Sequence, residues 1–225
     1  MLQIYKVFIK NFFVAIGYCP HLMKNVDLIS QSCSCIFCSS SLDDENTMTQ
    51  ISTASLLCNY LIFNSYNLKG NLIIHSIHCN DIFQNLKQKY SFIISAGGVV
   101  LNEKDEVLMI LKNNIWDLPK GKKDMLESDS EAAVREVNEE TNVKIASIFD
   151  GPFSTYHMYS CSQEQKQNNM ILKETKWFLM HADSKERLRP QLEECINDVA
   201  WIPKKQVFQI KTYDSVKLVF EYFFN

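Results

Sequence analysis

The chain has 225 residues, of which 46% are apolar and 22% are charged, and it contains few glycines and prolines. Such a composition is typical of a globular protein that buries a sizeable core, and the length has room for one full domain and a smaller second one. The formal net charge of −3 argues against a generic nucleic-acid binder, because such proteins normally carry a basic surplus.

The N-terminal segment bears on the expected location of the protein. A short apolar run, residues 12–18, follows Lys6 and Lys10. The run is at the lower limit for the core of a signal peptide, and no small-x-small cleavage pattern follows it. No stretch of the sequence approaches the length of a membrane span. We therefore expect a cytoplasmic protein with no membrane partner.

The eight cysteines are scattered along the chain, which does not favour a disulfide framework. Reduced thiols are the expected state in a cytosolic protein. Cys35 and Cys38 have the spacing of a zinc-ligand pair, and Cys33 lies beside them. No second close pair follows, so a metal site at these three cysteines is the minority interpretation.

The first 89 residues predict a small α/β domain of unknown role. Two short strands, residues 3–9 and 12–18, flank Lys10-Asn11 and form a hairpin candidate. The segment 27–50 is rich in Ser, Asp, Asn and Thr, which indicates a loop. Apolar patterns farther along predict a helix at 51–62, a strand at 72–77 and an amphipathic helix at 81–89.

The second predicted domain, residues 90–225, begins with an apolar strand at 92–101. This strand is interrupted by Ala96-Gly97-Gly98, and adjacent glycines inside a strand indicate a bulge or the close approach of another backbone. A turn at 103–105 leads to a second strand at 106–111. The segment 116–121 is expected to be a loop.

A helix is well marked at residues 129–141. Ser128 is an N-cap candidate, and Asn142 occupies the C′ position, where Asn is second only to Gly. The remaining pattern predicts strands at 144–149, 153–160, 171–181 and 197–202, and a last helix at 213–223. Strands interleaved with these helices indicate an α/β sandwich with a mixed sheet.

Three carboxylates gather on the predicted helix. Glu136 lies three residues before Glu139 and four before Glu140, so all three lie on or near one face. Like charges at these spacings repel unless a cation lies between them, and clustered hard oxygen ligands suit Mg²⁺ or Mn²⁺. Arg135 is placed to hold a carboxylate four residues on. From the cluster alone, a solvated acidic helix face is an equally good interpretation.

The loop before the helix decides between these interpretations. The segment from Gly121 to Val143, GKKDMLESDSEAAVREVNEETNV, closely resembles the Nudix box, G-x5-E-x7-R-E-u-x-E-E-x-G-u, where u is aliphatic. The one departure is Asn142 in place of the second glycine, and Asn tolerates the left-handed conformation that the helix end needs. The matching positions are Gly121, Glu127, Arg135, Glu136, Val137, Glu139, Glu140 and Val143.

The resemblance extends beyond the box and covers residues 91–210. Nudix domains characteristically carry an A-G-G/A-V strand upstream, matched by Ala96-Gly97-Gly98-Val99, and an acidic segment before a late strand with Trp, matched by Glu193-Glu194 and Trp201. The resemblance implies the Nudix α/β/α sandwich. The N-terminal part resembles the additional small domain of some bacterial Nudix proteins.

The resemblance also implies a metal-dependent hydrolysis of a diphosphate linkage. Carried over by position, Glu136, Glu139 and Glu140 would bind Mg²⁺ or Mn²⁺, and the Gly121 carbonyl could join them. Arg135 would orient these carboxylates. Water would attack phosphorus while the metal neutralises charge on the bridging oxygens.

The base that activates water varies among Nudix hydrolases. Glu139 and Glu194 are the candidates here, and an exposed acidic loop is the alternative for Glu193 and Glu194. Glu127 would brace the loop before the helix or take part in a second metal shell beside the substrate.

The substrate is expected to be a small phosphorylated metabolite. Leu118-Pro119-Lys120-Gly121 resembles the segment that precedes the box in Nudix enzymes acting on dinucleoside polyphosphates and diphosphoinositol polyphosphates. Lys120 and Lys122 are candidates for binding phosphates as point charges. Tyr156 and His157, on a predicted strand, are candidates for stacking on a base or binding phosphate, with packing in the core or on the sheet as the alternative.

The resulting prediction is a diphosphohydrolase whose substrate is most simply a dinucleoside polyphosphate. ADP-ribose and nucleoside triphosphates remain open as substrates. A nucleotide-sensing Nudix module without turnover ranks lower, because such modules usually lose box carboxylates that this chain retains. Hydrolysis of RNA 5′ ends also ranks lower, because the chain has no basic surplus.

Overall fold

The computed structural model describes residues 4–9, 12–17, 33–39, 71–76, 79–160 and 170–224. Two compact units make up the chain, Met1–Phe92 with Tyr156–Lys173, and Ile93–Thr155 with Glu174–Asn225. The domain limits 1–89 and 90–225 stay a prediction. The helix predicted at 51–62 lies outside the described residues. Among the described residues, no helix combines the length and apolar character that crossing a bilayer requires.

The first unit is built on the predicted hairpin. Strands β1 (Ile4–Ile9) and β2 (Phe12–Gly17) pair antiparallel, with Ile9 opposite Phe12. Strand β4 (Asn71–Ser76) pairs parallel with both β2 and β3 (Cys33–Ser39). The prediction of a loop over 27–50 is therefore wrong at 33–39, where the short apolar run inside a polar segment pairs with β4. Any metal binding by the cysteines of β3 stays a prediction.

The helix predicted at 81–89 is present as α3 (Cys79–Lys89). Its buried residues Ile82, Phe83 and Leu86 have the spacing of one helix face. Phe83 stacks on Tyr5 of β1 with ring centroids 4.0 Å apart, and the Tyr5 hydroxyl donates a hydrogen bond to Asn80 Oδ1 at 2.8 Å. These contacts hold α3 against β1.

In the second unit, β5 (Ser91–Leu101) is bordered by β6 and β10 in the sheet order β11-β6-β5-β10-β9. The other strands are β6 (Glu106–Lys112), β9 (Ser147–Ser160), β10 (Met170–His181) and β11 (Ile196–Pro203), and the segments of β9 and β10 within Tyr156–Lys173 belong to the first unit. Parallel and antiparallel pairs both occur in the described strands, so the predicted mixed sheet is confirmed.

Two local predictions in this unit were wrong. The segment 116–121 is not all loop, because it contains parts of two three-residue strands, β7 (Ile115–Asp117) and β8 (Lys120–Lys122), which pair with β6 and β5. The strands predicted at 144–149 and 153–160 are a single strand, β9. Gly151, with a φ of 122°, adopts a conformation that L side chains rarely take, and the strand passes through Gly151-Pro152 without ending.

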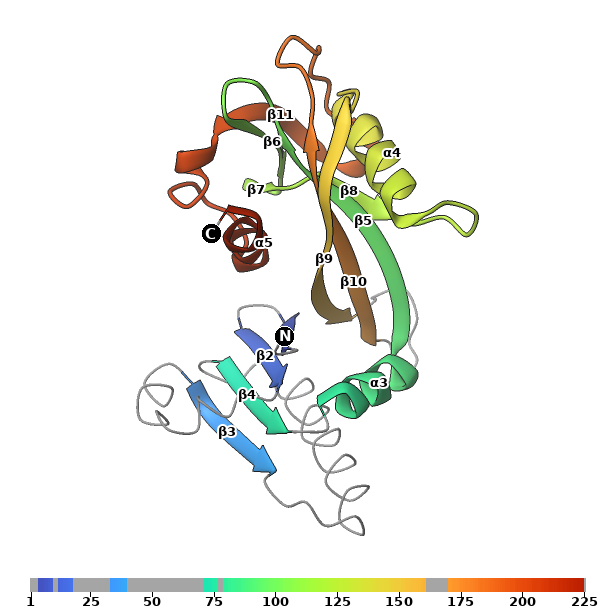
Figure 1. Ribbon diagram of the computed structural model, residues 1–225, viewed down its shortest axis with the longest axis vertical. Coiled ribbons are helices and arrows are strands. Elements are labelled where there is room, and N and C mark those ends of the chain that lie inside the picture. The colour runs from blue at the N-terminus through green and yellow to red at the C-terminus, as the bar shows by residue number, and fades with distance from the viewer. Residues whose placement is uncertain are drawn as a thin grey trace. The chain divides into compact units, whose positions relative to one another are not determined.

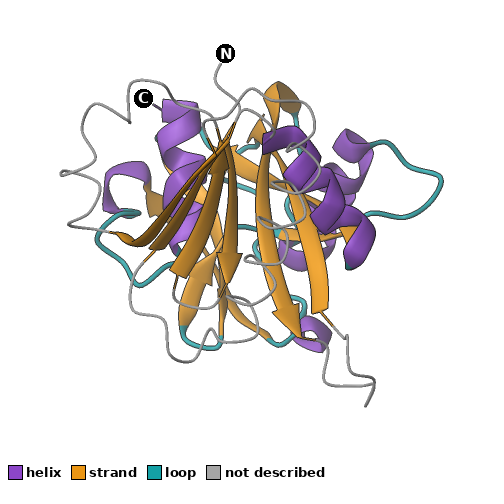
Figure 2. Ribbon diagram, turned by 90° about the horizontal axis from the view of Figure 1, so that it is seen from below, coloured by secondary structure: helices purple, strands orange, loops and turns teal. Residues whose placement is uncertain are grey.

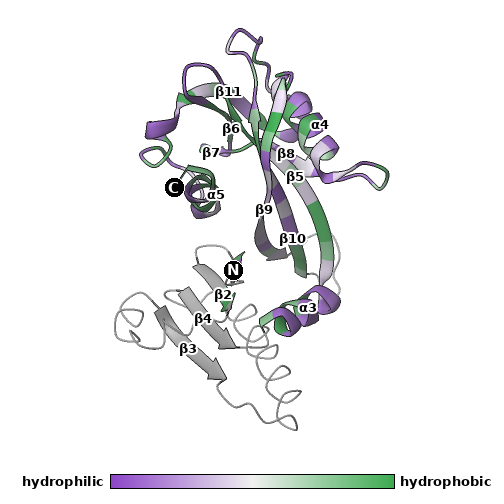
Figure 3. Cartoon of the chain, in the orientation of Figure 1, coloured by the Kyte–Doolittle hydropathy of each residue, from purple (hydrophilic) through white to green (hydrophobic). Residues whose placement is uncertain are grey.

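Two helices cover opposite faces of the second unit's strands (Figure 1 and Figure 2). Alternate strand residues divide between two cores. Val100 and Leu108 pack with α4 (Asp129–Thr141), whereas Val99 and Val107 pack with α5 (Asp214–Phe224). Figure 3 shows hydrophobic colour along much of β5 and hydrophilic colour on the outer loops. The predicted α/β/α sandwich is therefore confirmed.

Both ends of α4 have the predicted caps. Ser128 and Glu131 form a capping box, in which Glu131 N donates to Ser128 Oγ at 3.2 Å and Ser128 N donates to Glu131 Oε2 at 2.7 Å. Asn142 lies in the left-handed region with a φ of 65°, and its backbone N–H donates to Asn138 O. These caps set where the helix that carries the three glutamates begins and ends.

Replacing Ser128 by Ala should lower the free energy of unfolding by about 1 kcal/mol, because the backbone N–H of Glu131 loses the hydroxyl that caps it. Urea denaturation followed by circular dichroism measures the change. Ser128→Thr keeps a hydroxyl at the cap and serves as the matched control. A Ser128→Ala protein as stable as the wild type would show that the cap contributes nothing.

Candidate active site

Strand β8 brings the start of the box against the α4 helix. Gly121 is paired with Ala96 of β5, and its Cα faces the carboxylate of Glu136. A Cβ at position 121 would overlap that carboxylate, so only glycine allows Glu136 to lie against this backbone. Two residues that the sequence predicted as site members are thus in direct contact.

The two glycines of β5 also permit close approach. Gly98 N donates to Pro119 O at 3.1 Å, and a Cβ on Gly97 would overlap the same carbonyl. A Cβ on Gly98 would come within 2.9 Å of Val137 Cγ2 on α4. The predicted close approach of another backbone is therefore confirmed, and it lets both β8 and α4 pack directly on β5.

Arg135 joins the loop, the strand and the helix. Its guanidinium binds Glu127 through two hydrogen bonds, from Nε at 3.0 Å and from Nη2 at 2.6 Å. Nη1 donates to Glu136 at 2.8 Å and to Glu139 at 2.9 Å, and Nη2 donates to the carbonyl of Lys122 at 3.1 Å. The guanidinium therefore holds two of the three box carboxylates, including Glu139 four residues on.

Glu127 is fixed in the loop by its own hydrogen bonds. The Arg135 guanidinium and the backbone N–H of Asp124, which donates at 2.7 Å, lower the pKa of Glu127 to about 2. Its carboxylate is therefore ionised at neutral pH and braces the loop before α4. This geometry fits the loop-bracing role that the resemblance implies.

Glu136 and Glu140 are carboxylates withdrawn from water. Glu140 is 5% exposed, and its Oε2 accepts a hydrogen bond from the backbone N–H of Lys120 at 2.7 Å. Burial raises the pKa of Glu140 to about 7, and the nearby charge of Glu136 adds to this rise. Burial also raises the pKa of Glu136, with a further contribution from Glu139. Burial disfavours the charged form of both groups, and a cation bound between them would stabilise that form.

The third glutamate has a different environment. The Glu139 side chain is 46% exposed and pairs with Arg135. In the described part of the chain, no three His, Cys, Asp or Glu side chains lie close enough together to hold a metal ion. Glu136, Glu140 and Gly121 thus lie together at β8, whereas convergence of all three glutamates on one cation stays a prediction.

Lys120 is not a free phosphate-binding charge in this structure. Its ammonium pairs with Asp117 Oδ2 at 2.5 Å, lies 3.3 Å from Leu118 O and is 6.0 Å from the centre of the Trp177 ring. Burial lowers the pKa of Lys120, but the charges of Asp117 and Glu140 outweigh it, so the pKa is raised. Asp117 was missed as a site residue, although an acid three positions before Lys120 was a visible signal.

The other two lysines of the loop differ from each other. Lys122 is exposed, and its carbonyl accepts the bond from Arg135. Lys123 pairs with Asp129 at 2.6 Å, and Lys176 of β10 pairs with the same carboxylate at 2.7 Å. Lys176, which helps to tie the N-terminus of α4 to the sheet, had no sequence signal because it lies 47 residues from Asp129.

The loop that precedes β11 reaches the end of α4. Gln191 N donates to Glu140 O at 3.2 Å, which places the 3₁₀ turn η2 (Leu192–Glu194) next to the last turn of the helix. Glu194 itself is 57% exposed and lies 3.4 Å from Lys112 Nζ. The structure thus gives Glu194 an exposed position, as in the alternative interpretation of this acidic segment.

Tyr156 and His157 have protein partners in the first unit. The Tyr156 ring meets Phe83 edge-on with centroids 4.6 Å apart, and His157 stacks on Phe8 at 5.4 Å. Packing, the alternative that the sequence left open, is present for both rings. Their role in binding substrate stays a prediction.

Known proteins resemble this chain at the level of a domain profile and of single relatives. The sequence profile of the NUDIX domain matches residues 92–221, which is more than half of the chain. An RNA pyrophosphohydrolase of Ruthia magnifica subsp. Calyptogena magnifica is 30% identical over 125 residues, 48% of this chain and 66% of that protein. A putative 8-oxo-dGTP diphosphatase of Bacillus subtilis is 46% identical over 50 residues, 21% of this chain and 34% of that protein.

A third curated relative and two solved structures also match. The mRNA-decapping enzyme subunit 2 of Arabidopsis thaliana is 31% identical over 91 residues, 39% of this chain and 24% of that protein. The chain therefore spans less than two thirds of each of these curated relatives. A C. elegans Ap4A hydrolase structure is 21% identical over 58% of this chain and 94% of that one, with a TM-score of 0.47. A structure of a MutT Nudix hydrolase from Burkholderia pseudomallei is 20% identical, and the match covers 58% of this chain and 97% of that one, with a TM-score of 0.47.

The profile match spans residues 121–143, which form the box. The structure places Gly121 on β8, and Arg135 and the three glutamates on α4. By its sequence profile and by the geometry of its box, this chain belongs to the Nudix family.

Proposed function

We propose that the chain hydrolyses a diphosphate linkage in a nucleotide derivative with the help of a divalent cation. The observation that carries this proposal is the pair of desolvated carboxylates, Glu136 and Glu140, held against the backbone of Lys120 and Gly121. Carboxylate and carbonyl oxygens are the ligands that Mg²⁺ and Mn²⁺ prefer. The glycine that leaves room for Glu136 makes this backbone accessible to the carboxylates.

Glu136, Glu140 and Glu139 would hold the cation, and the Gly121 carbonyl would join them. When bound, such a cation neutralises charge on phosphate oxygens and lowers the pKa of coordinated water. Arg135 keeps Glu136 and Glu139 within reach of each other despite their like charges. Glu127 in turn holds Arg135 through two hydrogen bonds and acts as a positioning residue.

Glu139 is favoured over Glu194 as the group that takes the proton from the attacking water. Glu139 pairs with Arg135, and its side chain is about half exposed, so solvent reaches it. Glu194 is also exposed, but its contact is with Lys112. A base must come within hydrogen-bond distance of the water that it activates, and Glu139 shares the Arg135 guanidinium with Glu136, another proposed ligand.

A dinucleoside polyphosphate is the substrate that we propose. The Leu118-Pro119-Lys120-Gly121 segment supports it, and Lys122 is exposed and available for a phosphate. The pairing of Lys120 with Asp117 weakens this argument, because that charge is already neutralised. The relatives are named for 8-oxo-dGTP, RNA and mRNA decapping, and these substrates remain competitors of the proposed one. We further propose that the protein acts in the cytoplasm.

A substrate panel tests the proposed substrate. With Mg²⁺ or Mn²⁺, the protein should release mononucleotide from diadenosine tetraphosphate faster than from ADP-ribose, nucleoside triphosphates or 5′-triphosphate RNA. Chromatography of the products measures the rates. Preferred cleavage of RNA ends would replace the proposed substrate, and tight nucleotide binding without turnover under either metal would favour a sensor module.

Glu139→Gln and Glu140→Gln should each lower kcat by about 100-fold or more, because loss of even an indirect metal contact costs up to that factor. Initial rates at saturating substrate give the comparison. Glu221→Gln removes the same charge from an exposed position on α5 and should keep full activity. Full activity in both box variants would defeat the assignment.

Gly121→Ala should weaken metal binding by about tenfold or more, because the added methyl group displaces the Glu136 carboxylate from β8. Titration with Mn²⁺, monitored by electron paramagnetic resonance, reports the metal without any turnover. Met125→Ala, at a fully exposed position between β8 and α4, is the matched control. Unchanged Mn²⁺ affinity in the Gly121→Ala protein would remove Glu136 from the proposed site.

A further inference from the structure

The carboxylate of Asp117 closes the short turn that leads into β8. Its Oδ1 accepts a hydrogen bond from Leu118 N at 2.8 Å, and its Oδ2 accepts one from Lys120 Nζ at 2.5 Å. The same ammonium donates to Leu118 O at 3.3 Å. One carboxylate thus binds the backbone at the start of the turn and the side chain at its end.

Lys120 is also the residue that holds Glu140. Its backbone N–H donates to Glu140 Oε2 at 2.7 Å, so the lysine and this carboxylate are in direct contact. Burial raises the pKa of Glu140 to about 7, while the charge of Lys120 opposes that rise and the charge of Asp117 adds to it. The three charges are therefore close enough to act on one another.

Little water screens these charges. The side chains of Lys120 and Asp117 are 19% and 14% exposed, and Glu140 is 5% exposed. Charges in such surroundings interact more strongly than charges in water, and an ion that loses its partner there is strongly disfavoured. The ammonium of Lys120 therefore needs a counter-ion, and the structure gives it Asp117.

A second carboxylate lies ready to take the place of Asp117. Burial lowers the pKa of Lys120, and among the described carboxylates Asp117 and then Glu140 raise it most. Without the charge of Asp117, the next partner of the ammonium is Glu140. That carboxylate is one of the groups proposed to bind the divalent cation.

We propose that Asp117 is a positioning residue, which holds the Lys120 ammonium as its counter-ion and so leaves Glu140 free for a divalent cation. This role rests on the proposed function, because it presumes a metal site at Glu140. If Asp117 lost its charge, the ammonium would pair with Glu140 and would repel the cation, since both are positively charged.

Titration of the full chain with Mn²⁺, followed by electron paramagnetic resonance, measures this effect without turnover. Asp117→Asn keeps an acceptor for Leu118 N but removes the charge, and it should weaken Mn²⁺ binding by about tenfold or more. Adding Lys120→Met should restore the affinity to within about threefold of the wild type, because the double variant leaves no uncompensated buried charge in this pair. A purely structural role of Asp117 predicts no such rescue.

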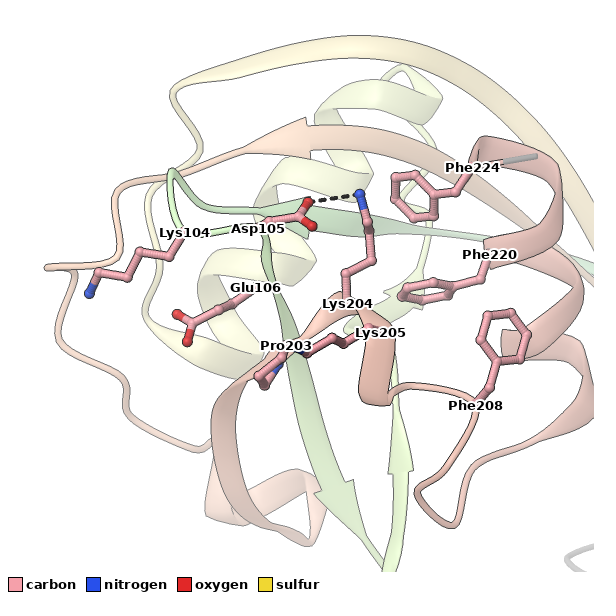
Figure 4. A pocket seen from close by; sticks show the side chains of 9 residues that line it. All are labelled: Lys104, Asp105, Glu106, Pro203, Lys204, Lys205, Phe208, Phe220 and Phe224. Atoms are coloured by element: carbon pink, nitrogen blue, oxygen red, sulfur yellow. Dashed lines mark ion pairs between the residues drawn. The ribbon is translucent and has the colours of Figure 1, made fainter.

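A second ion pair of the same kind provides the matched control. Lys204 pairs with Asp105 at 2.8 Å, and Figure 4 shows these two side chains directed toward each other in a pocket whose lining residues lie outside the box. Asp105→Asn makes the same substitution in a lysine–aspartate pair and should leave the Mn²⁺ affinity unchanged. Circular dichroism shows whether each variant is folded.

The single variant Lys120→Met provides the test if Asp117→Asn does not fold. It removes the ammonium and leaves Glu140 without a competitor for the cation, so it should bind Mn²⁺ at least as tightly as the wild type. Binding weaker by about tenfold would overturn the proposal, because it would show that the ammonium supports the metal site.

The outcomes separate this role from the proposed function. A wild-type protein that binds no Mn²⁺ would defeat the proposed metal site and the role of Asp117 together. Mn²⁺ binding by the wild type, with the same affinity in Asp117→Asn, would overturn the role of Asp117 alone. Weaker binding in Asp117→Asn that the added Lys120→Met does not restore would also overturn it.

Discussion

The candidate site depends on the hydrogen bonds that the guanidinium of Arg135 donates. It joins Glu127 of the loop, Glu136 and Glu139 of the helix and the carbonyl of Lys122 on β8. A planar group with five N–H donors can serve these acceptors together, which a lysine cannot do. Since neighbouring carboxylates repel, the helix tolerates them through this one cation and, in the proposed function, through a second, divalent one.

The contact between α4 and β8 also depends on particular residues. Glu136 reaches the backbone of β8 because residue 121 has no side chain, and Glu140 reaches it through the N–H of Lys120. The ammonium of Lys120 is itself neutralised by Asp117. The backbone of β8 contacts both carboxylates, so the short strand is both a structural link and the surface on which the proposed chemistry occurs.

Local patterns predicted much of the fold. The limits of α4, both of its caps and the strands β5, β6, β10 and β11 followed from periodicity and capping residues, because each is decided by neighbours within a few positions. Errors arose where the local signal was short or mixed. Three-residue strands such as β7 and β8 carry too few side chains for a period, and β3 is hidden in a polar segment.

The sequence by itself determined which residues form the box and that three glutamates share one side of a capped helix, since spacings of three and four residues need no tertiary information. Only the tertiary structure decided which charges remain available. It neutralised Lys120 with Asp117, and it paired Asp129 with both Lys123 and Lys176. The contact between Lys176 and Asp129 joins residues 47 positions apart, and its geometry is set by the packing of α4 on the sheet, which no local pattern records.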